Sequence, residues 1–334
     1  MKHLKTVLSI SLISLGIVTT ELHAATKWNV SLWGKRRAFT EHVEKMAEIV
    51  KQKSGGEFTL NISYGGLSKN RENLDGISIG AFEMAQFCSF YHAGKNPSIT
   101  VTELPFSKDV SLAKLAEISM KVYKHPTVVK DLARWNATLL MPTPLPQYNI
   151  LGKEGNLNTI ADFKGLRVRG PGGIMGVLGK LGAIKTGVPF GEVRQSMDSG
   201  VIDAAAFAPH AHLATKTTDI GKWVTTNLNL GTANCPVVVN SDALKALSPK
   251  NRQILLDAVN PSIDHYVDNY NNKTTGKFQK KVAEKGIDRI QFGPAAVAQL
   301  NDLAGSVRQD WIKKYSRKFD SKDLFNFTSG LFGK

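Results

Sequence analysis

The first part of the chain alternates between strand-like and helix-like hydrophobic patterns. Apolar and polar residues alternate over residues 27–32 and 58–64, which is typical of strands with one buried face, and apolar positions recur at helical spacing over residues 39–51. A second helix is predicted over residues 71–79 and a third strand over residues 82–87. Strands that alternate with helices in this order predict an α/β lobe with a doubly wound sheet.

A similar succession recurs in the second part of the chain. Glu72 is followed eight residues later by Gly80, and Glu192 is followed eight residues later by Gly200, with an apolar run after each glycine. We interpret this as two α/β lobes of related topology, with a chance similarity of two helix-to-strand turns as the alternative. We predict lobe I over residues 25–146, with 235–275 returning to it, lobe II over 147–234, and helices in 276–334 that pack across the lobes.

Several segments are predicted to cross between the lobes. Prolines interrupt residues 142–146, so the first crossover is expected there. Residues 223–230 and 235–240 are predicted as strands that return to lobe I. Residues 249–285 are predicted as one helix, long enough to span both lobes, and residues 294–315 as another. Two lobes joined by several crossings predict a cleft that can close on a ligand by hinge motion, which is typical of periplasmic binding proteins.

One predicted strand ends in an arginine just before a glycine-rich turn. Leu166 and Val168 alternate with polar residues, Arg169 follows, and helical spacing resumes at Ile174 after the glycines. The carboxyl ends of strands are where open α/β sheets bind ligands. A guanidinium offers a planar fork of donors that suits a carboxylate. Arg169 is therefore either the anion anchor of a ligand site or one half of a surface salt bridge.

The amino terminus has the pattern of a secretory signal peptide. A positively charged start precedes a short apolar run over residues 7–19, and Ala24 and Ala25 supply small residues for cleavage. We predict a signal peptide over residues 1–24, cleaved near Ala24, and a soluble protein in the periplasm. The net charge of +15 is spread over scattered lysines without a nucleic-acid motif, so we expect a surface that attracts small anions and no nucleic-acid partner.

The remaining chemistry of the sequence is sparse. Residues 170–176 place their glycines out of register with a dinucleotide-binding fingerprint, and His210 and His212 lack further metal ligands at suitable spacing. We therefore expect no cofactor, no metal and no enzymatic centre, with an exported enzyme acting on anions as an alternative. Cys88 and Cys235 could form a disulfide after export. We favour free thiols, because a chain of this length can bury a sufficient core without a covalent cross-link.

Three passages together resemble a known family. Residues 51–64, 162–169 (Asp-Phe-Lys-Gly-Leu-Arg-Val-Arg) and 192–203 are similar to conserved segments of the periplasmic solute-binding subunits of tripartite ATP-independent periplasmic (TRAP) transporters, of the dicarboxylate-binding type. The resemblance implies a two-lobe α/β fold, a lobe-spanning helix, and a receptor that delivers an organic acid to a membrane permease. We expect a monomer, although the sequence leaves the oligomeric state open. It implies that Arg169 pairs with the ligand carboxylate. A binding protein of an ATP-driven importer and a ligand-sensing subunit are the alternatives.

The chain departs from sialic-acid-type members of that family near the site. It reads Gln147-Tyr148-Asn149 where such members carry a second arginine, and it has Phe207 where they have a polar contact. We therefore hypothesise a monocarboxylate with an apolar or aromatic body, and leave a small dicarboxylate or a sulfonate open. Arg37 belongs either to an anion-steering loop or to a solvated charge run, and Phe90 either to the site or to the core. The candidate ligand contacts are Arg169, Trp33, Phe207, Asn149, Phe90 and Arg37.

Overall fold

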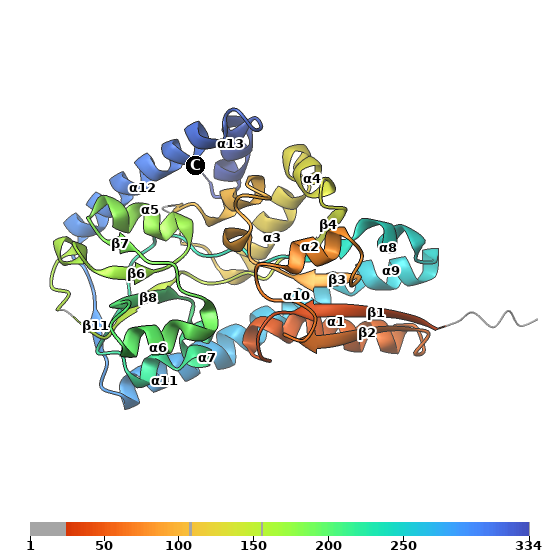
Figure 1. Ribbon diagram of the computed structural model, residues 1–334, viewed down its shortest axis with the longest axis horizontal. Coiled ribbons are helices and arrows are strands. Elements are labelled where there is room, and N and C mark those ends of the chain that lie inside the picture. Colours follow the sequence, from red (N-terminus) through yellow and green to blue (C-terminus); the bar gives the residue numbers. More distant parts are fainter. Residues whose placement is uncertain (1–24, 107–108, 155, 334) are drawn as a thin grey trace, which may run out of the picture.

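The computed structural model describes residues 25–106, 109–154 and 156–333, which form two β-sheets covered by helices (Figure 1). Lobe I carries a five-stranded sheet of order β2-β1-β3-β10-β4, and lobe II a six-stranded sheet of order β11-β9-β5-β8-β6-β7. The predicted two-lobe α/β fold is confirmed, while the exact boundaries proposed for the lobes remain a prediction.

The strands of lobe I are β1 (Thr26–Leu32), β2 (Phe58–Tyr64), β3 (Met84–Gln86), β4 (Ala137–Met141) and β10 (Val237–Asn240). Those of lobe II are β5 (Asn149–Gly152), β6 (Arg167–Arg169), β7 (Ile184–Lys185), β8 (Ala204–Phe207), β9 (Trp223–Thr225) and β11 (Asp288–Ile290).

The two sheets share one topology. The order β2-β1-β3-β10-β4 in lobe I matches β7-β6-β8-β5-β9 in lobe II. In each lobe the first three of these strands are parallel and the next two pairings are antiparallel. The turns between α2 (Asn73–Ser78) and β3 and between α6 (Val193–Asp198) and β8 also agree, because Gly80 and Gly200 both have a left-handed φ, of 69° and 72°. The recurrence seen in the sequence therefore reflects two lobes of related topology.

Helices cover the sheets through apolar faces of helical spacing. In α1 (Glu41–Lys53) the buried apolar residues are Val43, Met46 and Val50, which pack in one core cluster with β1 and β2. The other helices against lobe I are α3 (Leu112–Tyr123), α4 (Pro126–Ala133), α8 (Ser241–Ala246) and α9 (Pro249–Asp257). Lobe II carries α5 (Gly172–Lys180), α6 and α7 (Pro209–Thr215).

A long helical segment spans both lobes, as predicted. It comprises α10 (Val259–Asn269), a π-helical turn (Tyr270–Thr274) and α11 (Thr275–Glu284), and Gly286 with a φ of 61° follows its end. In Figure 1 its first part, α10, lies beside α1 of lobe I, and its last part, α11, lies at the lower left beside α7 of lobe II. The predicted single helix over 249–285 is wrong at one point, because α9 ends at Asp257. Pro261 explains the break, since proline donates no hydrogen bond and its ring crowds the carbonyl four residues earlier.

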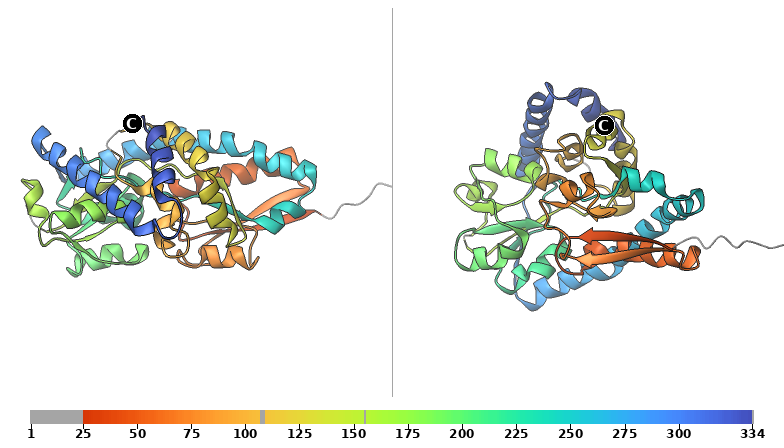
Figure 2. Two further views of the ribbon diagram at one scale, coloured as in Figure 1. Left: turned by 90° about the horizontal axis from the view of Figure 1, so that it is seen from above. Right: turned by 45° about the vertical axis from the view of Figure 1, so that its right-hand side comes forward.

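Two carboxy-terminal helices lie against the other side of the lobes. The first, α12 (Pro294–Tyr315), has the predicted bounds and packs on α5 of lobe II. The second, α13 (Ser321–Leu331), was not predicted and packs on α3 of lobe I. Figure 2 shows the pair from two further directions. Among the described residues, no helix is long and apolar enough to cross a membrane, and the predicted signal peptide over 1–24 lies outside them.

One predicted crossing is wrong. Residues 223–230 were expected to return to lobe I as a strand, but β9 ends at Thr225 and lies in lobe II between β5 and β11. Both of its edges are occupied there, since it pairs antiparallel with β5 and parallel with β11. The return to lobe I is made by residues 226–236, which lead into β10.

The expectation of free thiols is also wrong, because Cys88 and Cys235 form a disulfide. Val237 lies opposite Gln86 in the antiparallel pair of β10 and β3. Backbone hydrogen bonds continue this register beyond the strands and place Cys88 directly opposite Cys235. The disulfide joins the segment that returns from lobe II to the segment that carries Phe90, and a strand pairing between distant residues was needed to bring the cysteines together.

Candidate functional site

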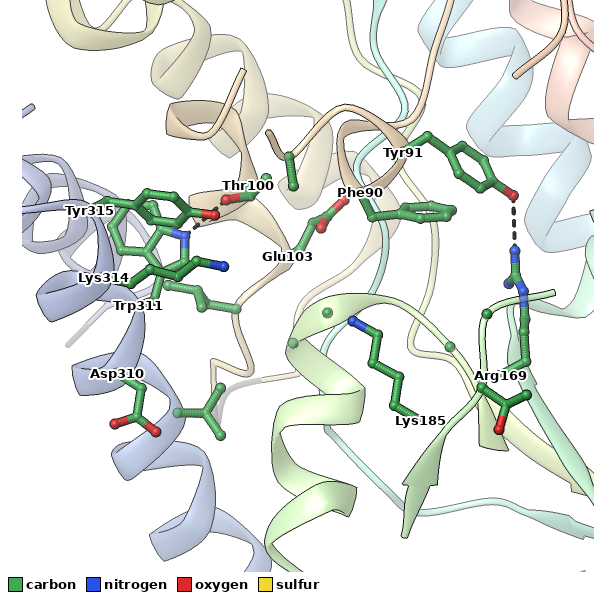
Figure 3. A pocket seen from close by; sticks show the side chains of 18 of the residues that line it. Phe90, Tyr91, Thr100, Glu103, Arg169, Lys185, Asp310, Trp311, Lys314 and Tyr315 are labelled. Atoms are coloured by element: carbon green, nitrogen blue, oxygen red, sulfur yellow. Dashed lines mark hydrogen bonds between the residues drawn. The ribbon is translucent and has the colours of Figure 1, made fainter. Parts of the chain in front are cut away.

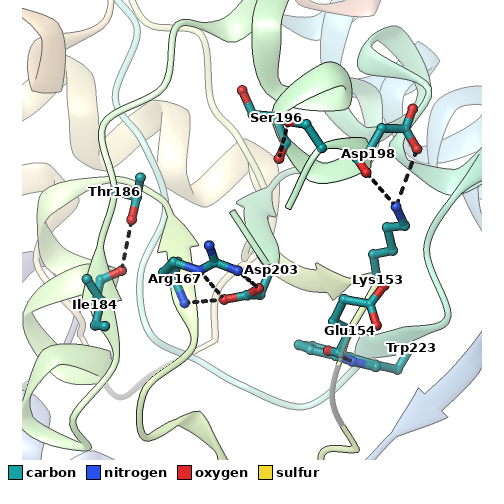
Figure 4. A network of polar contacts seen from close by, with 10 residues as sticks. Lys153, Glu154, Arg167, Ile184, Thr186, Ser196, Asp198, Asp203 and Trp223 are labelled. Carbon is teal, nitrogen blue, oxygen red and sulfur yellow. Dashed lines mark hydrogen bonds and ion pairs between the residues drawn. The ribbon is translucent and has the colours of Figure 1, made fainter. Parts of the chain in front are cut away.

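The two sequence motifs of lobe II, residues 162–169 and 192–203, are joined by an ion pair between Arg167 and Asp203 (Figure 4). The Asp203 carboxylate accepts hydrogen bonds from the backbone N–H of Arg167 (2.7 Å) and from its Nε (2.9 Å). The backbone N–H of Asp203 in turn donates to the Arg167 carbonyl oxygen (2.8 Å). The bonds from Arg167 lower the pKa of Asp203. This reciprocal clamp fixes β6, and with it the position of Arg169 two residues further on.

Arg169 ends β6 and lies between the lobes. It is 5% exposed, and its Nη2 donates to the Tyr91 hydroxyl of lobe I (2.9 Å; Figure 3). Within lobe II its Nε donates weakly to the Val188 carbonyl oxygen (3.4 Å), and its Cζ lies 4.5 Å from the centre of the Phe207 ring. None of the carboxylates that the structure describes forms an ion pair with it. The guanidinium is thus buried, aimed at lobe I and uncompensated by an acid.

A cavity of about 470 Å³ opens beside Arg169, with walls from lobe I, lobe II and α12. Its apolar lining includes Phe90, Leu104, Val307 and Trp311. Its basic lining consists of Arg71, Arg169, Lys185 and Lys314. Such a mixture suits a small anionic molecule with an apolar body.

Glu103 contributes a buried carboxyl group to the same cavity. Its Oε1 accepts a hydrogen bond from the Ser89 hydroxyl and a longer one from the Asn234 backbone N–H (3.4 Å). Burial raises the pKa of Glu103 to about 7, so this group is largely protonated in mildly acidic solution. Lys185 points into the cavity from the opposite wall (Figure 3). The sequence offered only a weak signal for Glu103, an acidic residue inside an apolar run.

Four aromatic rings meet where the lobes touch, and we call them the aromatic box: Trp33, Tyr91, Phe190 and Phe207. Trp33 lies 5.4 Å from Phe190 and 5.9 Å from Tyr91 between ring centres, and Phe190 lies 5.5 Å from Phe207. Trp33 and Tyr91 come from lobe I, and the two phenylalanines from lobe II. Tyr91 and Phe190 were missed in the sequence, although Tyr91 follows Phe90 directly and Phe190 precedes the 192–203 motif by two residues.

The structure places the predicted contacts unequally. Arg169 and Phe207 lie together, Trp33 joins them through the aromatic box, and Phe90 is half-buried on the cavity wall 5.8 Å from the Arg169 Cζ. Arg37 packs on the Trp33 ring, with its Cζ 4.4 Å from the ring centre. Asn149 is different, because its side-chain amide donates to the Thr225 carbonyl oxygen within lobe II (2.9 Å) and the residue does not line the cavity beside Arg169.

Comparisons with known proteins agree with this architecture. Residues 30–314 match the bacterial extracellular solute-binding proteins, family 7. A TRAP solute-binding protein from a marine metagenome, specific for aromatic acid ligands and solved with metahydroxyphenylacetate, has a TM-score of 0.83 at 20% identity, with 92% of this chain and 98% of that chain covered. The TRAP solute-binding protein of Rhodoferax ferrireducens, solved with copurified benzoate, has a TM-score of 0.82 at 19% identity, with 92% and 97% covered.

A curated relative is similar over a shorter stretch. The monocarboxylate 2-oxoacid-binding periplasmic protein of a Nostoc strain is 27% identical over 190 residues, which cover 54% of this chain and 50% of that protein. The match therefore spans about half of the relative's length. The family match covers most of the chain and agrees with the resemblance to TRAP receptors seen in the sequence. This chain therefore belongs to family 7 of the bacterial extracellular solute-binding proteins.

Proposed function

We propose that this protein is a monomeric periplasmic receptor that binds a small organic acid and delivers it to a TRAP-type permease. One observation carries the proposal, namely the buried Arg169 guanidinium, which has partners in both lobes and no acidic partner among the described residues. Burial of a charge is costly unless a counter-charge and hydrogen bonds compensate it. The carboxylate of a ligand would supply both.

The surroundings of Arg169 support a carboxylate on a flat or apolar body. The Tyr91 hydroxyl accepts its hydrogen bond from Arg169, so its own proton is available to a ligand oxygen. The centres of the Phe90 and Phe207 rings lie 5.8 and 4.5 Å from the Arg169 Cζ, so both rings offer apolar contact area near the guanidinium. The benzoate and metahydroxyphenylacetate in the solved relatives are acids of this kind.

Closure of the lobes would follow from the same contacts. A ligand carboxylate held by Arg169 of lobe II and by Tyr91 of lobe I links the lobes directly, and the crossing segments and α10–α11 serve as the hinge. Export depends on the predicted signal peptide over 1–24, cleaved near Ala24. We infer binding and delivery and no catalysis, and the contrasting function is an exported enzyme that acts on anions.

A ligand screen tests the proposal. Melting temperatures are measured with a panel of aliphatic and aromatic carboxylic acids, and hits are titrated by calorimetry. A ligand at a hundredfold excess over its dissociation constant adds about 2.7 kcal/mol to stability, which a melting scan detects. Recovery of the unchanged acid after incubation excludes turnover. A panel in which no acid raises the melting temperature, or in which the acid is consumed, contradicts the proposal.

A further inference from the structure

The loop after β1 carries a second buried guanidinium, that of Arg37. Its Nη1 donates to the carbonyl oxygens of Trp33 (3.2 Å) and Lys35 (2.7 Å). Its Nε and Nη2 are buried without a hydrogen-bond partner among the described residues, and so is Nε1 of Trp33. Buried donors in native proteins are almost always paired. These N–H groups therefore mark a place where an acceptor is missing.

The charge of Arg37 is also uncompensated. No acidic side chain in the described part of the chain forms an ion pair with it, and burial lowers its pKa to about 10. The cation is held against aromatic rings instead, with its Cζ 4.7 Å from the centre of Phe39 and 5.3 Å from that of Phe190. Contacts of this kind replace only part of the lost hydration of a buried cation. An anion at this place would stabilise the buried charge.

The position of Arg37 mirrors that of Arg169 in the topology. Strand β1 occupies in lobe I the place that β6 occupies in lobe II. Arg37 lies in the loop that follows the carboxyl end of β1, and Arg169 is the last residue of β6. Ligands of open α/β sheets bind beyond these strand ends. Each lobe thus brings one buried guanidinium to the boundary between the lobes.

Both guanidiniums border the same aromatic box. Arg37 lies over Trp33 and Phe190, and Arg169 lies over Phe207 and donates to Tyr91. Tyr91 connects them through Trp33, because its hydroxyl accepts a hydrogen bond from Arg169 and its ring packs on Trp33, over which Arg37 lies. A ligand with negative charge at both ends would supply each guanidinium with a counter-charge.

A basic cleft leads to Arg37 from solvent. The cleft has a volume of about 720 Å³ and is lined by both lobes and by the lobe-spanning helix. Its walls carry six basic residues and one acidic residue, Glu41, whose Oε2 is buried without a hydrogen-bond partner among the described residues. The basic residues are Lys35, Arg36, Arg37, Arg194, Lys216 and Lys277. This cleft is separate from the cavity beside Arg169, and the aromatic box lies between them. Anions are therefore attracted from both sides.

We propose that Arg37 and the Trp33 indole N–H form a second ligand anchor, so that the physiological ligand carries a second anionic or hydrogen-bond-accepting group at the end opposite the carboxylate bound by Arg169. The ligand class is then a bifunctional organic acid with a flat or apolar body held in the aromatic box. This inference rests on the proposed function, since it assumes that one carboxylate is bound by Arg169.

Matched pairs of acids test the second anchor. Calorimetric affinities are compared for benzoate against benzene-1,4-dicarboxylate and benzene-1,3-dicarboxylate, and for hexanoate against adipate, so that each comparison adds one carboxylate to a fixed body. We expect the wild-type protein to prefer a dicarboxylate in at least one series by about tenfold or more. Arg37→Gln should abolish this preference, so that the dicarboxylate loses about tenfold or more affinity beyond any loss of the matched monocarboxylate.

Arg36→Gln is the matched control. It removes the same charge from the neighbouring residue, whose side chain is 75% exposed and bonded to Glu44, so the dicarboxylate preference should persist. Equal weakening of mono- and dicarboxylates by Arg37→Gln would overturn the second anchor and assign Arg37 to loop or closure stability. The absence of any dicarboxylate preference in the wild-type protein would overturn it as well. Monocarboxylate binding that depends on Arg169 would leave the proposed function standing in either case, whereas failure of all acids to bind would contradict both.

Discussion

Replacement of Arg169 by lysine separates the geometry of the proposed anchor from its charge. Lysine keeps the positive charge but lacks the planar set of N–H donors of a guanidinium. It therefore cannot bind the Tyr91 hydroxyl and a ligand carboxylate simultaneously, as Arg169 is proposed to do. Hydrogen bonds to charged groups contribute about 1.5–3 kcal/mol each. Loss of one such bond to the ligand, together with release of the Tyr91 hydroxyl, amounts to about 3 kcal/mol, or about a hundredfold in affinity.

Titration calorimetry with the acid identified in the screen measures this loss at constant pH and salt. Arg134→Lys is the control, because it makes the same substitution away from the cavity beside Arg169, in an ion pair with Asp131 whose arginine side chain is 59% exposed. We expect that control to change affinity by less than about 1 kcal/mol. An Arg169→Lys protein that binds within about threefold of wild type would show that the fork does not hold the ligand, and the reasoning would fail.

Three further predictions follow from the same structure. The disulfide joins residues 147 positions apart, so chain entropy predicts that replacing both Cys88 and Cys235 by alanine lowers the free energy of unfolding by up to about 5 kcal/mol. Urea unfolding measures this loss, with the reduced wild-type protein as control. Equal stability of the oxidised and reduced proteins would refute the prediction. The folded pKa of Glu103 is about 7, against an ordinary 4.5, so the folded protein retains a proton that the unfolded chain releases. This carboxyl therefore stabilises the fold below about pH 4.5, and its contribution of about 3 kcal/mol is lost as the pH rises to 7. The difference in stability between Glu103→Gln and wild type should grow over that window in favour of the variant, and a constant difference would argue against it. A methyl group on Gly173 of α5 would overlap the Glu103 carbonyl oxygen of lobe I, so Gly173→Ala should hinder closure and weaken ligand binding about tenfold or more. Gly179→Ala is the control, because a methyl group there meets open space on the same helix and should leave the affinity unchanged. Equal affinities of the two variants would contradict this close approach.

Neighbouring residues show how far local sequence can predict the site. Arg36 and Arg37 belong to one run of basic residues, yet Arg36 is exposed and bonded to Glu44, while the Nε and Nη2 of Arg37 are buried between the lobes. Phe90 and Tyr91 are likewise adjacent, but only Tyr91 bonds Arg169. Sequence periodicity does not distinguish such neighbours, because the difference arises from contacts with the opposite lobe.

The sequence alone determined what depends on local geometry. Hydrophobic spacing located β2 and α12 at their observed bounds and placed Arg169 at the end of a strand, because the periods of strands and helices are properties of neighbouring residues. The tertiary structure decided which distant segments meet: the opposition of Cys88 and Cys235, the sheet that receives β9, and the approach of Arg37 and Tyr91 to the site of Arg169. These depend on strand order, register and the packing of one lobe on the other, which no local pattern records.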